Sequence, residues 1–202
     1  MDQNSALITQ VSTWLGTGSL NIFGMQLSGK DTQGAALSKL FNGPLLGGGD
    51  ILRNSVIPPR AQAALDVGDL VDTQDYVDIV LPYLSKSEFI GKPLILSALG
   101  RWIGEEKNVL AATEASGHPT KAVIYLDITE EEALRRLAVA DRGRADDHEE
   151  NLRHRLEEFR NKTLPVLEEY RKLGLLININ GMQAPELITE DILNQLNKRA
   201  SA

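Results

Sequence analysis

A glycine-bearing turn between an apolar run and a helical pattern restricts the fold of this chain more than any other feature. The apolar run 20–23 enters Gly24-Met-Gln-Leu-Ser-Gly29-Lys30, and apolar residues after Gly29 recur at helical spacing. The turn therefore faces the first N–H groups of a helix and its positive dipole end. Glycines let further N–H groups converge there, and Lys30 adds a mobile cation. This pattern, G-x-x-x-x-G-K, predicts a phosphate-binding loop rather than a chance glycine-rich turn.

Apolar runs alternate with helical patterns along the rest of the chain. Runs at 93–96, 122–126 and 175–179 predict buried strands, and each is followed by a segment of helical period. This alternation predicts an α/β fold in three layers, with a parallel sheet covered by helices on both faces. A short helix is expected over 5–15, and the longest helical pattern, about 147–173, is expected to kink at Pro165.

Composition excludes several classes of protein. The 202 residues are 42% apolar, which is enough to close the core of one compact domain. A net charge of -7 disfavours binding to a nucleic acid polymer or an anionic membrane. The lack of cysteine excludes disulfides and thiolate-bound metals, and no stretch approaches the ~20 apolar residues of a membrane span. We therefore expect a cytoplasmic protein.

Further motifs follow the phosphate loop in a fixed order. Thr32-Gln33 completes the first motif, and later ones are Gly49-Asp-Ile-Leu-Arg53, Gly68-Asp-Leu-Val71, Gly143-Arg144-Ala-Asp-Asp147 and Thr163-Leu-Pro165. From about residue 22 to the C-terminus this order resembles the nucleoside monophosphate kinases of the adenylate kinase family. The resemblance implies a P-loop NTPase-type domain over 19–202, after a helical extension over 1–18. It also implies a helical acceptor-binding region at about 48–78 and a short lid at about 138–147.

The resemblance further implies an activity and the residues that carry it. The expected reaction is phosphoryl transfer from ATP, with Mg²⁺, to a nucleoside monophosphate, and AMP is the default acceptor. The enzyme is expected to be a monomer. ATP would be bound by Leu27, Ser28, Gly29, Lys30, Asp31, Thr32, Arg136 and Gln183. The acceptor would be bound by Gly48, Arg53, Asp69, Leu70, Val71, Ala98, Arg101, Glu105, Arg144 and Arg155. Positive charge stabilises the transferring group, so the catalytic set would be Lys30, Arg101, Arg136, Arg144 and Arg155.

Other polar residues are expected to lie outside the site. In the simplest interpretation, five of them lie at the solvated surface, namely Arg135, Arg153, Arg160, His118 and His154. Trp102 directly follows Arg101 and is a candidate for the wall of the acceptor pocket.

The sequence departs from the family pattern at the acceptor and metal motifs. Ser97 stands where the family has a carboxylate, Glu105 where adenylate kinases have a glutamine, and Gly48 where a threonine is usual. Asp31 replaces a glycine after Lys30, and it either binds Mg²⁺ or simply favours the helix N-terminus. Two alternatives therefore stay open: GMP or another monophosphate as acceptor, because Glu105 could accept from guanine, and a nucleotide-binding regulator without turnover.

Overall fold

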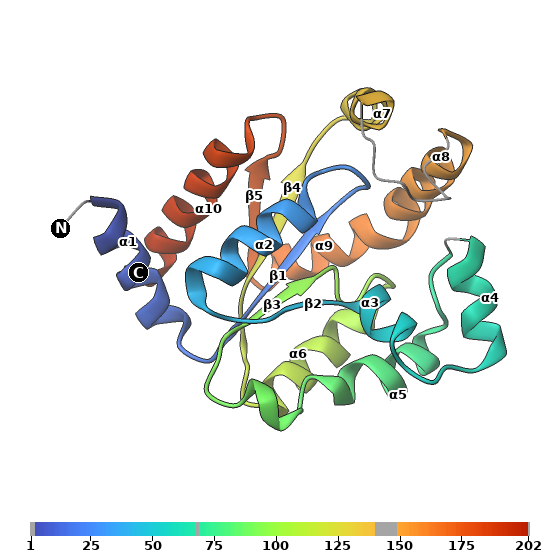
Figure 1. Cartoon of the computed structure of the whole chain (residues 1–202), viewed down its shortest axis with the longest axis horizontal. Coiled ribbons are helices and arrows are strands. Elements are labelled where there is room, and N and C mark those ends of the chain that lie inside the picture. Colours follow the sequence, from blue (N-terminus) through green and yellow to red (C-terminus); the bar gives the residue numbers. More distant parts are fainter. Residues whose placement is uncertain (1–2, 68, 140–148, 202) are drawn as a thin grey trace.

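The computed structural model describes residues 3–67, 69–139 and 149–201 (Figure 1). Within these residues five parallel strands form one sheet in the order β2-β3-β1-β4-β5. The strands are β1 (Ser19–Gly24), β2 (Leu45–Gly47), β3 (Leu94–Ser97), β4 (Thr120–Asp127) and β5 (Leu176–Asn180).

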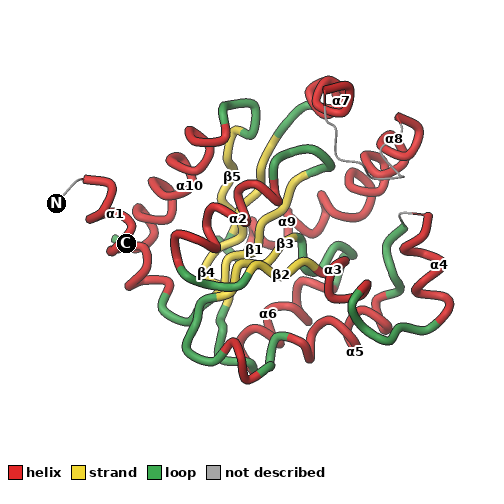
Figure 2. The backbone as a smooth tube through the Cα atoms, in the orientation of Figure 1, coloured by secondary structure: helices red, strands yellow, loops and turns green. Residues whose placement is uncertain are grey.

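Helices connect the strands and cover both faces of the sheet (Figure 2). Their bounds are α1 (Gln3–Leu15), α2 (Lys30–Phe41), α3 (Gly48–Arg53), α4 (Pro59–Val67), α5 (Thr73–Tyr83), η1 (Ser87–Phe89), α6 (Glu105–Ala115), α7 (Glu130–Val139), α8 (Glu149–Glu158), η2 (Phe159–Thr163), α9 (Leu164–Lys172) and α10 (Pro185–Ala200). The predicted three-layer α/β architecture is confirmed. No helix in the described ranges is both long and apolar enough to cross a bilayer.

The period of two along each strand divides the core between the two faces. On β1, Leu20 and Ile22 pack with α1, α2 and α10, whereas Phe23 faces α9 on the other side. On β4, Ile124 and Tyr125 divide in the same way. The central strands β1, β3 and β4 are largely buried on both faces, which explains their apolar runs in the sequence, whereas β5 at the edge alternates between buried and exposed residues.

The long helical pattern over 147–173 is interrupted before the expected kink. A π-helical turn, η2, separates α8 from α9, and Pro165 lies in the first turn of α9. Proline has no N–H to donate and its ring crowds the carbonyl four residues earlier, at Asn161, so a wider turn there relieves the clash. The irregularity therefore lies just ahead of the proline.

The expectation that His118 lies on the surface is wrong. Only 3% of this residue is exposed, and its Nδ1 lies 2.9 Å from the carbonyl oxygen of Thr17. The imidazole therefore connects the bend between α6 and β4 to the residues just before β1. A local sequence pattern does not show this contact, because the two residues are far apart in the chain.

Helix α1 packs along α10, so the two terminal helices lie side by side (Figure 1). Val11 and Leu15 of α1 are buried in the core that α10 shares with the sheet, and Trp14 packs partly against it. Gln10 also donates a hydrogen bond from Nε2 to Ser201 Oγ at 2.9 Å. The segment expected as an extension thus contributes to the main core.

Candidate active site

The phosphate loop lies at the carboxyl end of β1, where backbone geometry shapes it. Leu27 and Gly29 have φ values of 65° and 94°, so the loop turns through the left-handed region twice. Gly24 is required because a Cβ there would lie 2.3 Å from Ser28 Oγ and 2.9 Å from the carbonyl oxygen of Leu126. The chain can therefore turn sharply from β1 into α2, which leaves the first N–H groups of α2 at the loop.

Lys30 and Asp31 begin α2 directly after the loop. Lys30 Nζ donates to the carbonyl oxygen of Met25 at 3.0 Å, which folds the side chain back over the loop. Asp31 is exposed in the first turn, where a carboxylate also favours the helix dipole. Ser28 Oγ is buried and has no hydrogen-bond partner among the described residues. Lys30 and Asp31 are thus adjacent in the first turn of α2, directly after the loop, and the Ser28 hydroxyl is enclosed.

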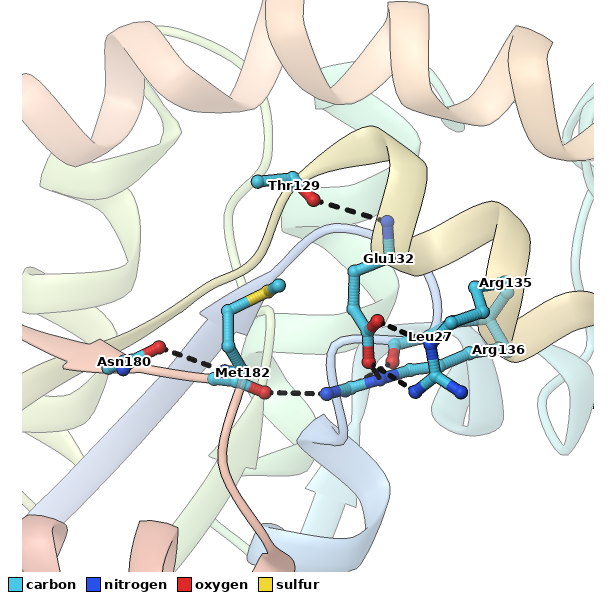
Figure 3. Close-up of polar contacts among 8 residues, drawn as sticks. Leu27, Thr129, Glu132, Arg135, Arg136, Asn180 and Met182 are labelled. Atoms are coloured by element: carbon cyan, nitrogen blue, oxygen red, sulfur yellow. Dashed lines mark hydrogen bonds and ion pairs between the residues drawn. The ribbon is translucent and has the colours of Figure 1, made fainter.

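Arg136 of α7 joins the phosphate loop to the turn after β5 (Figure 3). Its Nη1 donates to the carbonyl oxygen of Leu27 at 3.0 Å, and its Nη2 donates to that of Gly181 at 2.7 Å. Glu132 accepts from Arg136 Nε at 2.7 Å and also binds Arg135. The backbone atoms of two loops are thus fixed by one guanidinium and one carboxylate.

A pocket of about 420 Å³, counted with the solvent at its mouth, opens beside the loop that follows β3. Most residues predicted to bind the acceptor meet there, together with others that the sequence did not single out. The lining residues are Gly48, Gly49, Leu52, Leu65, Asp69, Leu70, Val71, Tyr76, Ala98, Arg101, Trp102 and Glu105. Trp102 lies in the pocket wall, as the sequence suggested.

Asn21 fixes the position of this loop against β1, and the sequence analysis missed it. Its side chain accepts from the N–H of Leu99 at 3.1 Å and donates to the carbonyl oxygen of Leu99 at 2.8 Å. The N–H of Ala98 donates to the carbonyl oxygen of Ile22 at 2.9 Å. A buried amide inside an apolar strand was the available signal, because such a group needs partners.

Glu105 supports the loop as well as lining the pocket. It is 1% exposed, and its Oε2 accepts from the backbone N–H groups of Arg101 and Trp102 at 2.8 and 3.0 Å. Its Oε1 accepts from the hydroxyl of Thr73 at 2.9 Å, which links the loop to α5. Both carboxylate oxygens therefore already accept protein donors.

Arg101 holds a positive charge in a partly desolvated place. Burial lowers its pKa, and the neighbouring cation Arg155 lowers it further, while Glu158 has the opposite effect. Arg155 projects from α8 and so comes near Arg101 from a helix far along the chain. Two guanidinium groups close together favour an anion between them.

The remaining predicted residues are not all at the pocket. Arg53 is exposed and pairs with Asp50 at 2.6 Å, yet a Cβ on the pocket residue Gly49 would lie 3.3 Å from its guanidinium. Gln183 lies in the turn after β5 and donates to Asp191 at 2.6 Å. Arg144 and most of the expected lid lie outside the described residues.

Two of the arginines that were expected to be solvated form ion pairs at the surface. Arg135 pairs with Glu132 and Arg160 with Glu130, and both arginines are exposed, so these expectations are confirmed. His154 is also half exposed, but its Nε2 lies 2.7 Å from Oδ1 of the pocket residue Asp69. This contact links α8 to the acceptor side of the site.

Comparison with known proteins identifies the family. The family model for adenylate kinase matches residues 22–175, which is most of the chain. The chain belongs to the adenylate kinase family. Adenylate kinase of Leptospira biflexa serovar Patoc is 31% identical over 176 residues, covering 84% of this chain and 94% of the relative. The adenylate kinases of Agrobacterium fabrum and Thermobifida fusca are 31% and 32% identical, and each match covers 86% of this chain and 95% of the relative.

Membership of the adenylate kinase family settles the class of reaction. The chain is a nucleoside monophosphate kinase, a phosphotransferase that uses ATP, as the ordered motifs predicted. The matched region includes the phosphate loop and every pocket residue, whereas α1, β5 and α10 lie outside it.

Proposed function

We propose that this chain transfers the terminal phosphoryl group of ATP to AMP and forms two molecules of ADP. The observation that carries the proposal is the adjacency of the phosphate loop and the acceptor pocket. The loop follows β1, the pocket residues Ala98 and Arg101 follow β3, and β1 and β3 are neighbours in the sheet. Ligands of open parallel sheets bind at the carboxyl ends of the strands, so a donor and an acceptor would meet at this edge.

The chemistry of the site fits direct transfer between two nucleotides. Phosphoryl transfer needs alignment and positive charge, and it needs no covalent protein intermediate. Lys30 and the loop Leu27–Thr32 would hold the ATP phosphates, Arg136 and Gln183 would flank ATP, and Arg101 and Arg155 would stabilise the group in transfer. Arg144 and the segment 138–147 would complete the site as a short lid that excludes water.

The acceptor pocket supports AMP over GMP. The Glu105 carboxylate already accepts three hydrogen bonds from the protein, so its oxygens are not held ready for the N1–H and exocyclic amine of guanine. Gly48, Asp69, Leu70, Val71 and Ala98 would surround the acceptor. Arg53 would reach its phosphate by leaving Asp50.

Magnesium would accompany ATP. Mg²⁺ in nucleotide sites is bound by one or two carboxylates together with phosphate oxygens and water. The described residues contain no group of three or more carboxylates and histidines that could hold an ion by themselves, so the phosphates would supply most ligands. Asp31 fits as the protein ligand because its carboxylate is exposed beside Lys30. The ion would neutralise charge on the phosphate oxygens.

A coupled assay tests the proposal. ATP and Mg²⁺ are supplied with AMP, GMP, CMP or UMP, and formation of nucleoside diphosphate is followed. We expect the highest kcat/KM with AMP. A higher value with GMP would favour the other acceptor, and ATP binding without product from any acceptor would favour a regulator. We also propose that the enzyme is a cytoplasmic monomer, which sedimentation and cell fractionation would test.

A further inference from the structure

Trp102 occupies a fixed position in the wall of the acceptor pocket. Its backbone N–H donates to Glu105 Oε2 at 3.0 Å, and the N–H of Arg101 donates to the same atom at 2.8 Å. One buried carboxylate therefore positions both residues of the loop. Arg101 provides charge, whereas Trp102 provides a flat apolar surface next to it.

The π-helical turn η2 also contacts the indole ring. Lys162 Nζ lies 4.1 Å from the centre of the ring, within the range of a cation–π contact. Lys162 belongs to the π-helical turn η2 and is paired with Glu158. Thr163 Oγ1 of the same turn approaches the carbonyl oxygen of Arg101 at 3.4 Å. Because Lys162 covers one face of the ring, only the other face and the edges remain for a ligand.

The remaining environment of the ring suits a nucleobase. Leu52, Leu65, Leu70 and Val71 line the same pocket with apolar surface, as flat heteroaromatic ligands require. The indole Nε1 is buried and has no hydrogen-bond partner among the described residues, so the ring is available to a ligand through its face rather than through a donated hydrogen bond.

We propose that Trp102 binds the base of the acceptor monophosphate by packing its indole ring against it, with Lys162 holding the ring in place. The inference rests on the proposed function, because it concerns the acceptor of that reaction. It assigns Arg101 to the phosphate and Trp102 to the base of the same ligand. Loss of the ring should then weaken binding of a nucleotide and leave binding of a ligand without a base unchanged.

Tryptophan fluorescence gives a direct test. The chain contains only Trp14 and Trp102, and Trp14 lies on α1 against the core, so Trp14→Phe leaves one reporter in the pocket. We expect AMP to change the emission of Trp14→Phe in a saturable way, and to leave the emission of Trp102→Phe, which keeps only Trp14, unchanged. An unchanged emission of Trp14→Phe at AMP concentrations that support turnover would overturn the proposal.

Kinetics provide the second test. Base–aromatic stacking corresponds to a loss of about 5- to 150-fold on truncation to alanine, so Trp102→Ala should raise KM for AMP by that factor. KM for ATP should stay within about twofold, and Trp102→Phe should recover part of the loss. The inhibition constant of ribose 5-phosphate, which has no base, should not change. An equal rise for AMP and ribose 5-phosphate, or no recovery with phenylalanine, would contradict a contact with the base.

These readouts separate the two proposals. If the wild-type protein forms no ADP from AMP, the proposed function fails whatever Trp102 does. If it forms ADP and the Trp102 variants behave as wild type, only the inference about Trp102 fails.

Lys162→Met keeps the length of the side chain without its charge, and it should raise KM for AMP less than Trp102→Ala does.

Discussion

Oε1 of Glu132 accepts a hydrogen bond from Nε of Arg136 at 2.7 Å, and this contact orients the guanidinium that joins the phosphate loop to the turn after β5 (Figure 3). Glu132 lies one helical turn before Arg136 on α7, and both side chains are largely buried. A guanidinium has five N–H donors in a rigid plane, so fixing one edge fixes the direction of the others. Through Arg136, Glu132 therefore positions the carbonyl groups of Leu27 and Gly181, which it does not itself contact.

The first prediction concerns pH. Hydrogen bonds from Arg135 and Arg136 lower the pKa of Glu132 to about 2 from its ordinary value of 4.5. The carboxylate therefore stabilises the fold fully above about pH 4.5, and this stability is lost as the pH falls toward 2. We expect the difference in Tm between wild type and Glu132→Gln to be largest near pH 7 and to shrink in acid. A difference independent of pH would contradict the ionic role, and Glu131→Gln on the exposed side of α7 is the control.

Loss of the loop cation should abolish turnover without unfolding the protein. Lys30 is only partly buried, so Lys30→Ala removes little packing. A cation beside developing phosphoryl charge contributes at least about a 100-fold factor in kcat. ADP formation and thermal unfolding should be measured together, with Lys39→Ala in the last turn of α2 as the control. Near wild-type turnover in Lys30→Ala would refute the assignment of the loop.

Arg155 should act on the chemical step more than on binding. It approaches Arg101 from α8, and a phosphoryl group that entered beside both cations would be stabilised by both. An interaction completed in the transition state appears in kcat, so Arg155→Ala should lower kcat by about 100- to 1000-fold with a smaller change in KM. Arg153→Ala on the exposed side of α8 is the control. A change in KM alone would make Arg155 a binding residue.

Removing the carboxylate of Glu105 should destabilise the loop. Leucine has no acceptor, so in Glu105→Leu the N–H groups of Arg101 and Trp102 and the hydroxyl of Thr73 would lose their common partner. Leaving buried donors unsatisfied costs about 1–3 kcal/mol, and Tm should fall by several degrees. Glutamine keeps an oxygen for the two N–H groups and an amide that can donate to the Thr73 hydroxyl, so Glu105→Gln should retain more of the stability. Calorimetry checks both variants, with Glu114→Leu on exposed α6 surface as the control. A Tm of Glu105→Leu equal to that of wild type would contradict the supporting role.

The last prediction addresses the metal. If Asp31 binds Mg²⁺ beside the phosphates, Asp31→Asn should raise the Mg²⁺ concentration that gives half-maximal turnover, while ATP affinity measured without the metal stays the same. Asp31 is exposed, so the substitution should not affect folding. An unaltered Mg²⁺ requirement would leave Asp31 with only the role of an acid at the N-terminus of a helix.

Much of the fold could be predicted because the central strands β1, β3 and β4 are largely buried on both faces. Apolar runs predicted β1, β3, β4 and β5 to within two residues at each end. Strand β2 was missed because three residues, Leu45–Gly47, are too few to form a pattern. The π-helical turn η2 was missed because its cause, Pro165, acts on a carbonyl that precedes it in the chain.

The site could be predicted where function depends on a local motif. Most residues expected to bind the acceptor line one pocket, and the phosphate loop lies directly between β1 and α2, because each motif lies beside the end of a strand or the start of a helix. Asn21, Tyr76 and Lys162 were missed, because each acts on a loop distant in sequence. Tyr76 accepts from the N–H of Gly100 at 2.9 Å, and only the folded chain shows this contact.

The pairing of α1 with α10 has a consequence for how the chain folds. Gln10 and Ser201 are 191 positions apart, so their contact closes nearly the whole chain. Closing a long segment loses entropy before the contact stabilises it, so such contacts form late. The sheet and its crossover helices can assemble on local contacts first. Helix α1 would then dock on α10 as a late step, and it would be an early element to separate when the protein opens, while α10 stays packed on α2 and β5.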